Sequence, residues 1–451
     1  MRTTPMLFLL ACGGPEPFPG NTDENDGKPD ADADTDADAD SDADGDTDTD
    51  SPGTWTAHLL DATLNHPRGL TVGDFTGDGK LDVLVTAGGD IELGALDGGQ
   101  VALYELGANL DSWTRIDVVT PDQLIEFPNQ PLPMDLDADG DLDFVLTAGL
   151  FICSSLPLGD CGSLSWVEQS AGGWALHTFV DGDDRFYQGG VLADIDHDGT
   201  VDLVVSGERV GPYGTDAQTH WYRGVGSASR FEATERLIGT GGGSFPTVRD
   251  IDGDGDDDIA VAEFAVPGES AVWYQRTGEP SGGTPNGTWS RFVIDSTLGT
   301  GWQMGWADID GDGLDDALMT NHVNAADGDL YVEGAYRLVP AADVRQAWTP
   351  TLLSTGIAAD PSLVGSTNAA PGAFGTGDLD GDGDIDLAIA GDGDPGVFVL
   401  INQNTSFDTM EVHPFLPEAF GMIVADLDGN GTQEVVLAGA VDNLVLVLER
   451  N

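Results

Sequence analysis

The chain has 451 residues, 40% of them hydrophobic, and it carries 80 acidic against 16 basic side chains, which gives a net charge of −64. That length and hydrophobic content allow one large all-β domain or two to three ordinary domains. The charge argues against nucleic acid as a partner, because binding to phosphates needs lysine and arginine. The acidic groups must either be spread over solvent or be balanced by bound cations.

The chain opens with MRTTPMLFLLACGG, which has one arginine, a short apolar run and a small residue before Cys12. That order is typical of a secretory signal peptide, here residues 1–11, and the LLAC end resembles the lipobox of bacterial lipoproteins. The resemblance implies a lipidated Cys12 and a place in the bacterial cell envelope, at the outer membrane or cell surface. The alternatives are a secreted protein and a soluble start with an incidental apolar stretch. No other apolar run reaches the roughly 18 residues of a membrane span, so lipid is the only expected anchor.

Residues 12–52 follow, and within them residues 21–50 alternate aspartate with small residues. Such a segment cannot bury enough apolar surface to offset its ordering entropy, so we expect a disordered spacer that charge repulsion extends. A calcium-binding aspartate tract is the alternative interpretation.

Seven copies of the pattern D-φ-[DT]-x-[DN]-G-x-x-[DE] follow, each directly before an apolar run of strand length. In each copy, side-chain oxygens at positions 1, 3, 5 and 9 and the carbonyl at position 7 can converge, while Gly at position 6 permits a sharp turn. Hard divalent cations take six to eight such oxygens, so the copies predict calcium sites. The candidate metal ligands are Asp74, Thr76, Asp78, Lys80 and Asp82; Asp135, Asp137, Asp139, Asp141 and Asp143; Asp194, Asp196, Asp198, Thr200 and Asp202; Asp250, Asp252, Asp254, Asp256 and Asp258; Asp308, Asp310, Asp312, Leu314 and Asp316; Asp378, Asp380, Asp382, Asp384 and Asp386; and Asp426, Asp428, Asn430, Thr432 and Glu434.

The copies differ in expected strength. Copies two to six hold acids at all four side-chain positions, whereas Thr76 in the first copy and Asn430 and Glu434 in the last predict weaker binding. We expect about five to seven Ca2+ ions in total. The alternative is that some copies are Asx-turns without a metal.

An aromatic residue recurs in step with the acidic copies, at intervals between 57 and 61 residues, as Trp55, Trp113, Trp174, Phe231, Trp289, Trp348 and Phe407. Each unit offers four strand candidates; in the first they are Gly69–Phe75, Leu81–Thr86, Val101–Glu105 and Trp113–Val118. Four antiparallel strands per repeat predict an all-β, seven-bladed β-propeller over residues 53–451. The last unit lacks its aromatic strand, so we expect residues 54–60 to complete it and close the ring, which a linear solenoid would not require.

The stretch FGTGDLDGDGDIDLAIAG at Phe374–Gly391 resembles an FG-GAP repeat, and the neighbouring copies resemble the bacterial VCBS-type relatives of that repeat. These units build seven-bladed propellers similar to the head of integrin α chains. The resemblance implies calcium in the hairpin loop between the first and second strands of a blade, and a protein or glycan partner on the opposite face.

Polar and aromatic residues in the segments between blades are the candidates for that ligand face. Aromatic packing between blades is the alternative, and we favour it for Phe374 and Phe420. The candidates are His66, Arg68, Asn129, Gln130, Tyr187, Gln188, Trp302 and Gln303, with Arg185 beside them.

Two further expectations concern covalent chemistry. Cys153 and Cys161, in CSSLPLGDC, suit a loop disulfide in an oxidising compartment. No nucleophile, zinc or phosphate-loop motif is present, so no catalytic residue is assigned.

We expect a monomeric, calcium-binding, non-catalytic recognition or adhesion protein. The alternatives are a secreted polysaccharide lyase or hydrolase that uses His66 and Arg68, and a scaffold without a soluble ligand.

Overall fold

The computed structural model describes residues 53–89, 91–92, 95–96, 98–150, 162–211, 214–264, 268–321, 323–324, 334–354, 368–369, 371–391, 396–404, 406–413, 416 and 419–451. All of them belong to one compact unit, Pro52–Asn451. The predictions for the signal peptide, for Cys12, for the Asp-rich segment and for the Cys153–Cys161 disulfide lie outside these residues.

The described part of the chain is all-β except for one 3-10 turn, η1 (Pro121–Gln123). Within these residues, no helix is long and apolar enough to cross a membrane. This composition agrees with the all-β class expected from the turn-rich sequence.

Five four-stranded antiparallel sheets account for twenty of the strands. Their members are β2 (Pro67–Gly73), β3 (Asp82–Ala87), β6 (Gln100–Leu106) and β7 (Trp113–Val119); β8 (Pro128–Met134), β9 (Asp143–Ala148), β10 (Gly162–Ser170) and β11 (Gly173–Asp183); β12 (Phe186–Ala193), β13 (Asp202–Gly211), β14 (Gly214–Tyr222) and β15 (Arg236–Thr240); β26 (Pro371–Gly377), β27 (Asp386–Gly391), β28 (Val397–Asn402) and β29 (Phe407–His413); and β30 (Ala419–Ala425), β31 (Glu434–Gly439), β32 (Leu444–Arg450) and β1 (Trp55–Asp61).

A sixth sheet has eight strands in two antiparallel runs of four, which one parallel pairing, Phe245 with Gln303, joins. The first run is β16 (Gly243–Arg249), β17 (Asp258–Glu263), β18 (Ala271–Gly278) and β19 (Thr288–Asp295); the second is β20 (Gly301–Ala307), β21 (Asp316–Asn321), β23 (Ala335–Val339) and β24 (Thr349–Leu352). Two short ribbons pair β4 (Ile91–Glu92) with β5 (Ala95–Leu96), and β22 (Val323–Asn324) with β25 (Asn368–Ala369).

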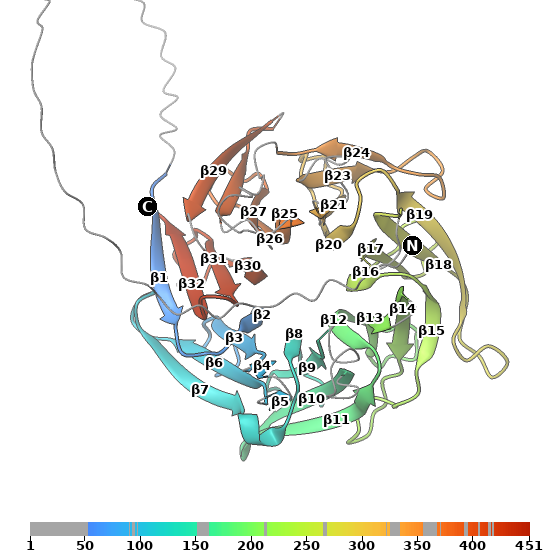
Figure 1. The fold of residues 1–451 in the computed structure, drawn as a ribbon, viewed down its shortest axis with the longest axis horizontal. Coiled ribbons are helices and arrows are strands. Elements are labelled where there is room, and N and C mark those ends of the chain that lie inside the picture. The colour runs from blue at the N-terminus through green and yellow to red at the C-terminus, as the bar shows by residue number, and fades with distance from the viewer. Residues whose placement is uncertain are drawn as a thin grey trace, which may run out of the picture. The chain divides into compact units, whose positions relative to one another are not determined.

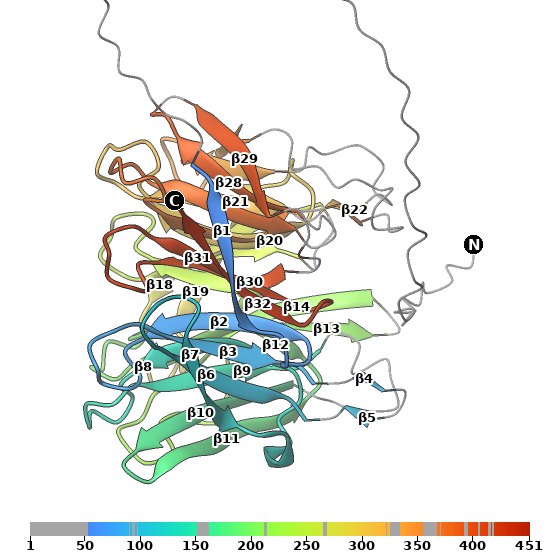
Figure 2. The same ribbon diagram turned by 90° about the vertical axis from the view of Figure 1, so that its left-hand side faces the viewer.

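The first strands of successive four-strand units contact one another in turn and close a circle, in the order β2, β8, β12, β16, β20, β26, β30 and back to β2. These strands surround the centre in Figure 1, and the fourth strands lie at the periphery. Seen after a 90° turn, inner strands such as β2, β3 and β9 run along the axis of the ring, whereas the outer strand β1 runs across it (Figure 2). The arrangement is propeller-like.

The N-terminal strand completes the last sheet, as the sequence predicts. β1 pairs antiparallel with β32, and Trp55 lies opposite Arg450 in the register. The pairing covers the edge of β32, which would otherwise expose unpaired backbone groups.

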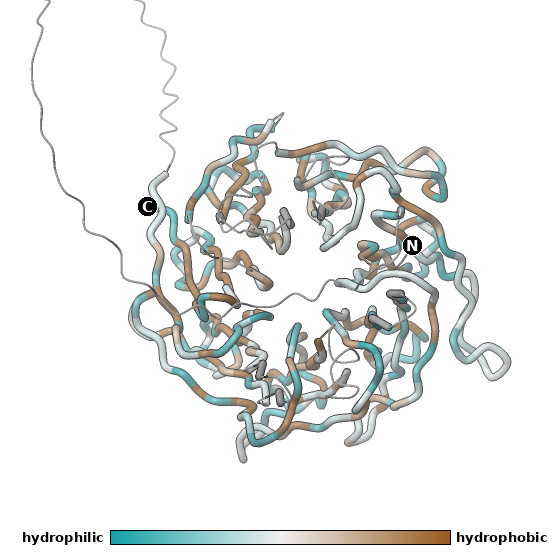
Figure 3. The backbone as a smooth tube through the Cα atoms, viewed as in Figure 1, coloured by the Kyte–Doolittle hydropathy of each residue, from teal (hydrophilic) through white to brown (hydrophobic). Residues whose placement is uncertain are grey.

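Burial explains the strand sequences. The second strands β3, β9, β17, β21 and β31 are buried at every position, because neighbouring sheets cover both of their faces. Their short continuous apolar runs are typical of such strands, and they appear as brown inner segments in Figure 3. The fourth strands are only partly buried and mix polar with apolar residues, as in β7.

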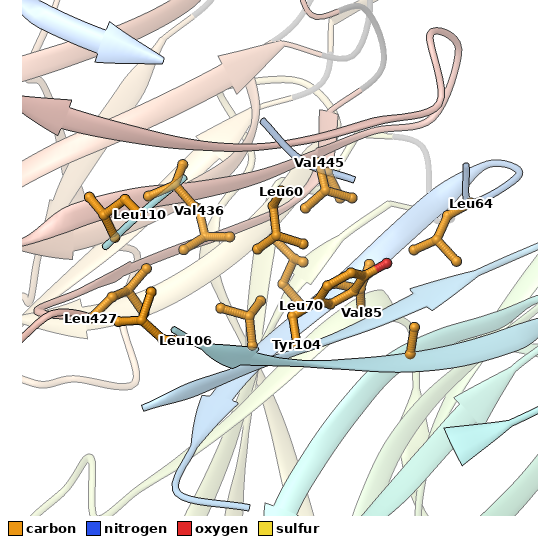
Figure 4. Packing of buried hydrophobic residues seen from close by; sticks show 14 of the residues in the cluster. Leu60, Leu64, Leu70, Val85, Tyr104, Leu106, Leu110, Leu427, Val436 and Val445 are labelled. Carbon is orange, nitrogen blue, oxygen red and sulfur yellow. The ribbon is translucent and has the colours of Figure 1, made fainter. Parts of the chain in front are cut away.

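The core lies between adjacent sheets. In the cluster that joins the last sheet to the β2 sheet, Leu60 of β1 meets Leu70 and Tyr104 on one side and Val436 on the other (Figure 4). Tyr104 and Val436 are at most 1% exposed. Full burial of an aliphatic side chain contributes about 1.5–3 kcal/mol, so this cluster holds the closing strand in place.

The boundaries of the first unit shift slightly from the prediction. The first strand is Pro67–Gly73 and not Gly69–Phe75, because the acidic loop begins its turn at Asp74. The second strand, Asp82–Ala87, begins one residue later than predicted, at the carboxylate that closes the loop.

Candidate metal centre

Each acidic copy forms the hairpin loop between the first and second strands of a four-strand unit. Positions 1 to 8 lie in the loop, and position 9 is the first residue of the second strand. The copies are numbered in chain order: loop 1 is Asp74–Asp82, loop 2 Asp135–Asp143, loop 3 Asp194–Asp202, loop 4 Asp250–Asp258, loop 5 Asp308–Asp316, loop 6 Asp378–Asp386 and loop 7 Asp426–Glu434.

The backbone has left-handed φ angles at positions 4 and 6 of every loop. Position 6 is always glycine, with φ from 86° in loop 1 to 100° in loop 2. A Cβ there would meet no atom within 4 Å, so conformation and not space selects the glycine. At position 4, Ala138 and His197 adopt the same region without being glycine.

The position-1 carboxylate fixes this turn. In all seven loops one of its oxygens accepts the position-6 backbone N–H, at 2.8–3.2 Å. In loops 2 to 5 the same carboxylate also belongs to one of the acidic groups described below. The carboxylate therefore both shapes the loop and offers a ligand atom.

The position-9 carboxylate closes the loop at its base, where the second strand begins. It is fully buried in six of the loops and 9% exposed in loop 5, at Asp316. One of its oxygens accepts a backbone N–H from the start of the same loop, for example from Ile195 to Asp202 at 2.8 Å and from Leu379 to Asp386 at 2.7 Å. These bonds orient the carboxylate toward the loop interior.

The acidic ligand atoms converge. In loops 2, 3 and 5 the carboxylates at positions 1, 3 and 9 each place an oxygen within 4.8 Å of the others, and in loop 4 those at positions 1, 3 and 5 do so. That spacing suits several oxygens around one hard cation. Position 7 donates its backbone N–H to the position-5 side chain, as Lys80 does to Asp78 at 2.9 Å.

Burial raises the pKa of the closing carboxylates, and the neighbouring aspartates add to the shift. The pKa rises to about 6 for Asp143 and Asp386, and to about 7 for Asp202, Asp258 and Glu434. Burial likewise raises the pKa of Asp82 and Asp316. Several carboxylates so close together need a positive charge to remain ionised.

Unpaired oxygens test whether a cation fits these loops. Among the described residues, Asp82 Oδ1 and Glu434 Oε1 are buried and accept no hydrogen bond, and neither do Asp74 Oδ1 and Asp196 Oδ1. Buried polar atoms without a partner are costly, and a calcium ion would supply one here. The donor set, all oxygen, suits calcium.

Arginines contact the position-3 aspartate in loops 2 to 6. In loops 2, 4 and 6 the other oxygen of that aspartate accepts the position-5 backbone N–H. The guanidinium therefore binds one oxygen and leaves the other on the loop side. The pairs and their shortest distances to position 3 are Arg230 with Asp137 at 3.4 Å, Arg223 with Asp196 at 2.6 Å, Arg345 with Asp252 at 2.6 Å, Arg337 with Asp310 at 2.5 Å and Arg450 with Asp380 at 3.6 Å.

The residues predicted for a ligand face lie partly in a cluster at the centre of the ring. Arg68 is 8% exposed and its guanidinium lies 4.2 Å from the ring centroid of Phe420. The Trp302 ring lies 6.2 Å from that of Phe420, although their strands β20 and β30 are not neighbours in the circle. Arg68 Nε also donates to Asn129 Oδ1 at 2.9 Å. These side chains therefore meet across the centre.

Other candidates connect adjacent sheets. Gln303 donates to the Phe374 carbonyl and accepts its N–H, both at 3.1 Å, and Gln130 accepts the Gly190 N–H at 2.9 Å. Phe374 itself is 5% exposed and packs with Ala307, Ile309 and Leu318 in a core cluster, which is the aromatic packing favoured above.

Three candidates have other environments. Tyr187 is fully buried and donates to Asp183 at 2.6 Å, so its side chain is not part of an exposed face. His66 Nδ1 lies 2.9 Å from the Gly89 carbonyl, and Gln188 is half-buried. Contact of any of these candidates with a ligand stays a prediction.

Sequence reasoning missed the five arginines above, and it also missed three third-strand residues that touch the loops, Gln169, Arg276 and Asn402. Each donates its backbone N–H to a position-9 carboxylate, at 2.7–2.9 Å. They lie in third strands, whose alignment across units is the only signal that could have revealed them.

The fold is an all-β ring, and the hairpin loop between the first and second strands of each unit carries clustered carboxylates. These features define the class: a propeller-like protein with acidic loops suited to bind cations. Comparison with family models then gives the family: an FG-GAP repeat matches residues 66–104, and an FG-GAP-like repeat matches residues 194–261 and 378–437. These segments contain loops 1, 3, 4, 6 and 7. The matched segments are FG-GAP and FG-GAP-like repeats, which is consistent with an FG-GAP repeat protein. A comparison with curated proteins found no match.

Proposed function

We propose that this protein is a calcium-stabilised recognition or adhesion module that acts without catalysis. FG-GAP propellers are typical of integrin-like recognition proteins. The observation that carries the calcium part is the convergence of three carboxylates in one loop after another, together with buried oxygens that lack a partner. Asp, Asn and Glu side chains with the position-7 carbonyl would hold the ion, and the ion would supply the charge that these loops lack.

We also propose that the ring has seven blades. The eight-stranded sheet consists of two four-stranded antiparallel runs joined by one parallel pairing, and each run carries its own acidic loop. Counted as two blades, these runs match the seven sequence repeats.

A calorimetric calcium titration of the chelator-treated protein tests the metal. The expected result is about five to seven ions per chain, with a rise in melting temperature because calcium binds the folded ring. Zero or one ion would overturn the assignment and leave the loops as turns.

Recognition is tested separately, by binding of the calcium-loaded protein to envelope glycans and peptides in a saturable manner. Depolymerisation of an anionic polysaccharide, abolished by His66→Ala, would instead support the enzyme alternative. Metabolic labelling with palmitate, lost in Cys12→Ser, would test the proposed lipid anchor in the cell envelope.

A further inference from the structure

Three side chains connect acidic loops of neighbouring units in pairs. They lie at equivalent places in the third strands β10, β18 and β28. The backbone N–H of each donates to the closing carboxylate of its own unit: Gln169 to Asp143 at 2.8 Å, Arg276 to Asp258 at 2.9 Å, and Asn402 to Asp386 at 2.7 Å.

The side chain of each reaches the loop of the preceding unit. Gln169 Nε2 donates to the Phe75 carbonyl at 2.8 Å, and Asn402 Nδ2 donates to the Ile309 carbonyl at 2.8 Å. The Arg276 guanidinium donates to the Ile195 carbonyl. All three acceptors are position 2 of their loops, between the ligands at positions 1 and 3.

A continuous hydrogen-bonded chain results, both between loops 3 and 4 and between loops 5 and 6. The Ile309 N–H donates to Asp316, its carbonyl accepts from Asn402, and the Asn402 N–H donates to Asp386. Asn402 is 4% exposed and, with Asn404, borders a cavity between the two loops. Hydrogen bonds in such a chain polarise one another.

The same connection joins loops 1 and 2 and loops 3 and 4, but other neighbouring loops lack it within the described residues. At the equivalent place in the third unit, Gly224 donates its N–H to Asp202 at 2.7 Å but has no side chain to reach loop 2. In loop 7, Glu434 Oε1 accepts no hydrogen bond, so this chain is not formed between loops 6 and 7.

We propose that Gln169, Arg276 and Asn402 are positioning residues that make calcium bind in pairs, to loops 1 and 2, 3 and 4, and 5 and 6. The inference rests on the proposed calcium binding. An ion in one loop fixes the closing carboxylate, which fixes the third-strand residue and through it position 2 of the neighbouring loop. The first ion has then already ordered the neighbouring loop. The second ion binds that loop at a smaller entropic cost, which is positive cooperativity.

The test counts bound ions by equilibrium dialysis with radioactive calcium, at the lowest free calcium that saturates the parent protein. Asp378→Ala removes the position-1 ligand of loop 6 and is expected to lose about two ions, its own and most of that in loop 5. The matched control, Asp426→Ala in loop 7, is expected to lose about one ion.

Asn402→Ala separates coupling from a merely structural role. The Asn402→Ala variant keeps the backbone N–H and loses only the side chain that reaches loop 5. Adding Asp378→Ala to this variant, at the free calcium that saturates Asn402→Ala, is expected to remove about one ion. Its circular dichroism spectrum reports whether it folds. If it does not, the half-buried Gln169 offers a second cycle, with Gln169→Ala and Asp135→Ala in loop 2.

The outcomes are distinct. A wild-type protein that binds no calcium overturns the proposed function and the pairing together. A wild-type protein that binds calcium, but loses a single ion in both Asp378→Ala and Asp426→Ala, overturns the pairing alone.

Discussion

The imidazole Nε2 of His58 lies 2.9 Å from a carboxylate oxygen of Glu449, although 391 residues separate them in the chain. Its Nδ1 lies 2.7 Å from Asp111, in the connection between β6 and β7. His58 belongs to β1 and Glu449 to β32, so one imidazole joins the closing strand to the elements on both sides of it.

This arrangement predicts a pH-dependent closure. Burial lowers the pKa of His58, but the two carboxylates outweigh it and the pKa is raised above 6.5. A raised histidine pKa stabilises the folded state below the unfolded pKa, and the stabilisation is lost as pH rises through the folded pKa. We expect His58→Gln to lower the urea midpoint at about pH 6 and to match the wild type at about pH 9. An equal loss at both pH values would show that charge is not involved.

Glu434→Gln in loop 7 should have opposite effects with and without calcium. Glu434 Oε2 accepts the Leu427 N–H at 2.8 Å, while Oε1 has no partner, so a glutamine amide can fill the same place. With chelator the variant should be at least as stable as the wild type, because a buried unpaired carboxylate is gone. With calcium it should bind about one ion fewer and melt at a lower temperature. Calorimetry in both conditions checks this, and equal melting shifts in both would contradict it.

Glu208 offers a second pH dependence, away from the metal loops. It is 3% exposed and its Oε2 has no hydrogen-bond partner. Burial, with a contribution from Glu263, raises its pKa to about 8. Between pH 4.5 and about 8 the folded state holds a proton that the unfolded state has lost, so stability falls as pH rises.

Glu208→Gln should remove this fall. In saturating calcium, we expect the variant to gain on the wild type by about 1.4 kcal/mol for each pH unit inside that window. The control is Glu263→Gln, which should destabilise, because Glu263 accepts the Gly242 N–H and lies 3.2 Å from Arg291. Parallel pH profiles for Glu208→Gln and the wild type would contradict the prediction.

The features that the sequence predicted correctly depend on patterns of residues that are close together in the chain. The acidic loop, its glycine and the apolar strand after it are consecutive in the chain, so their geometry follows from turn chemistry alone. The closing role of residues 54–60 followed from the missing aromatic strand of the last unit, and β1 pairs with β32 accordingly.

Side-chain contacts between neighbouring sheets could not be predicted from the sequence. Arg68 and Gln303 were candidates for a ligand face, but Gln303 binds the Phe374 backbone and Arg68 lies over Phe420. Which way such a side chain turns depends on the neighbouring sheet, and no spacing in the chain encodes that. Asn402 was missed for the same reason.

The glycine at position 6 gives a test of the loop backbone itself. Gly431 has φ of 93°, and a Cβ there would meet nothing within 4 Å, so Gly431→Ala adds only conformational strain. In saturating calcium we expect a loss of about 1–2 kcal/mol in the free energy of unfolding, because alanine disfavours the left-handed region that brings this N–H to Asp426 at 3.0 Å. Gly282→Ala is the matched control, since Gly282 has equally open surroundings without a left-handed φ; its effect should be close to zero or slightly stabilising. Equal losses in both variants would mean that the left-handed turn is not what selects the glycine.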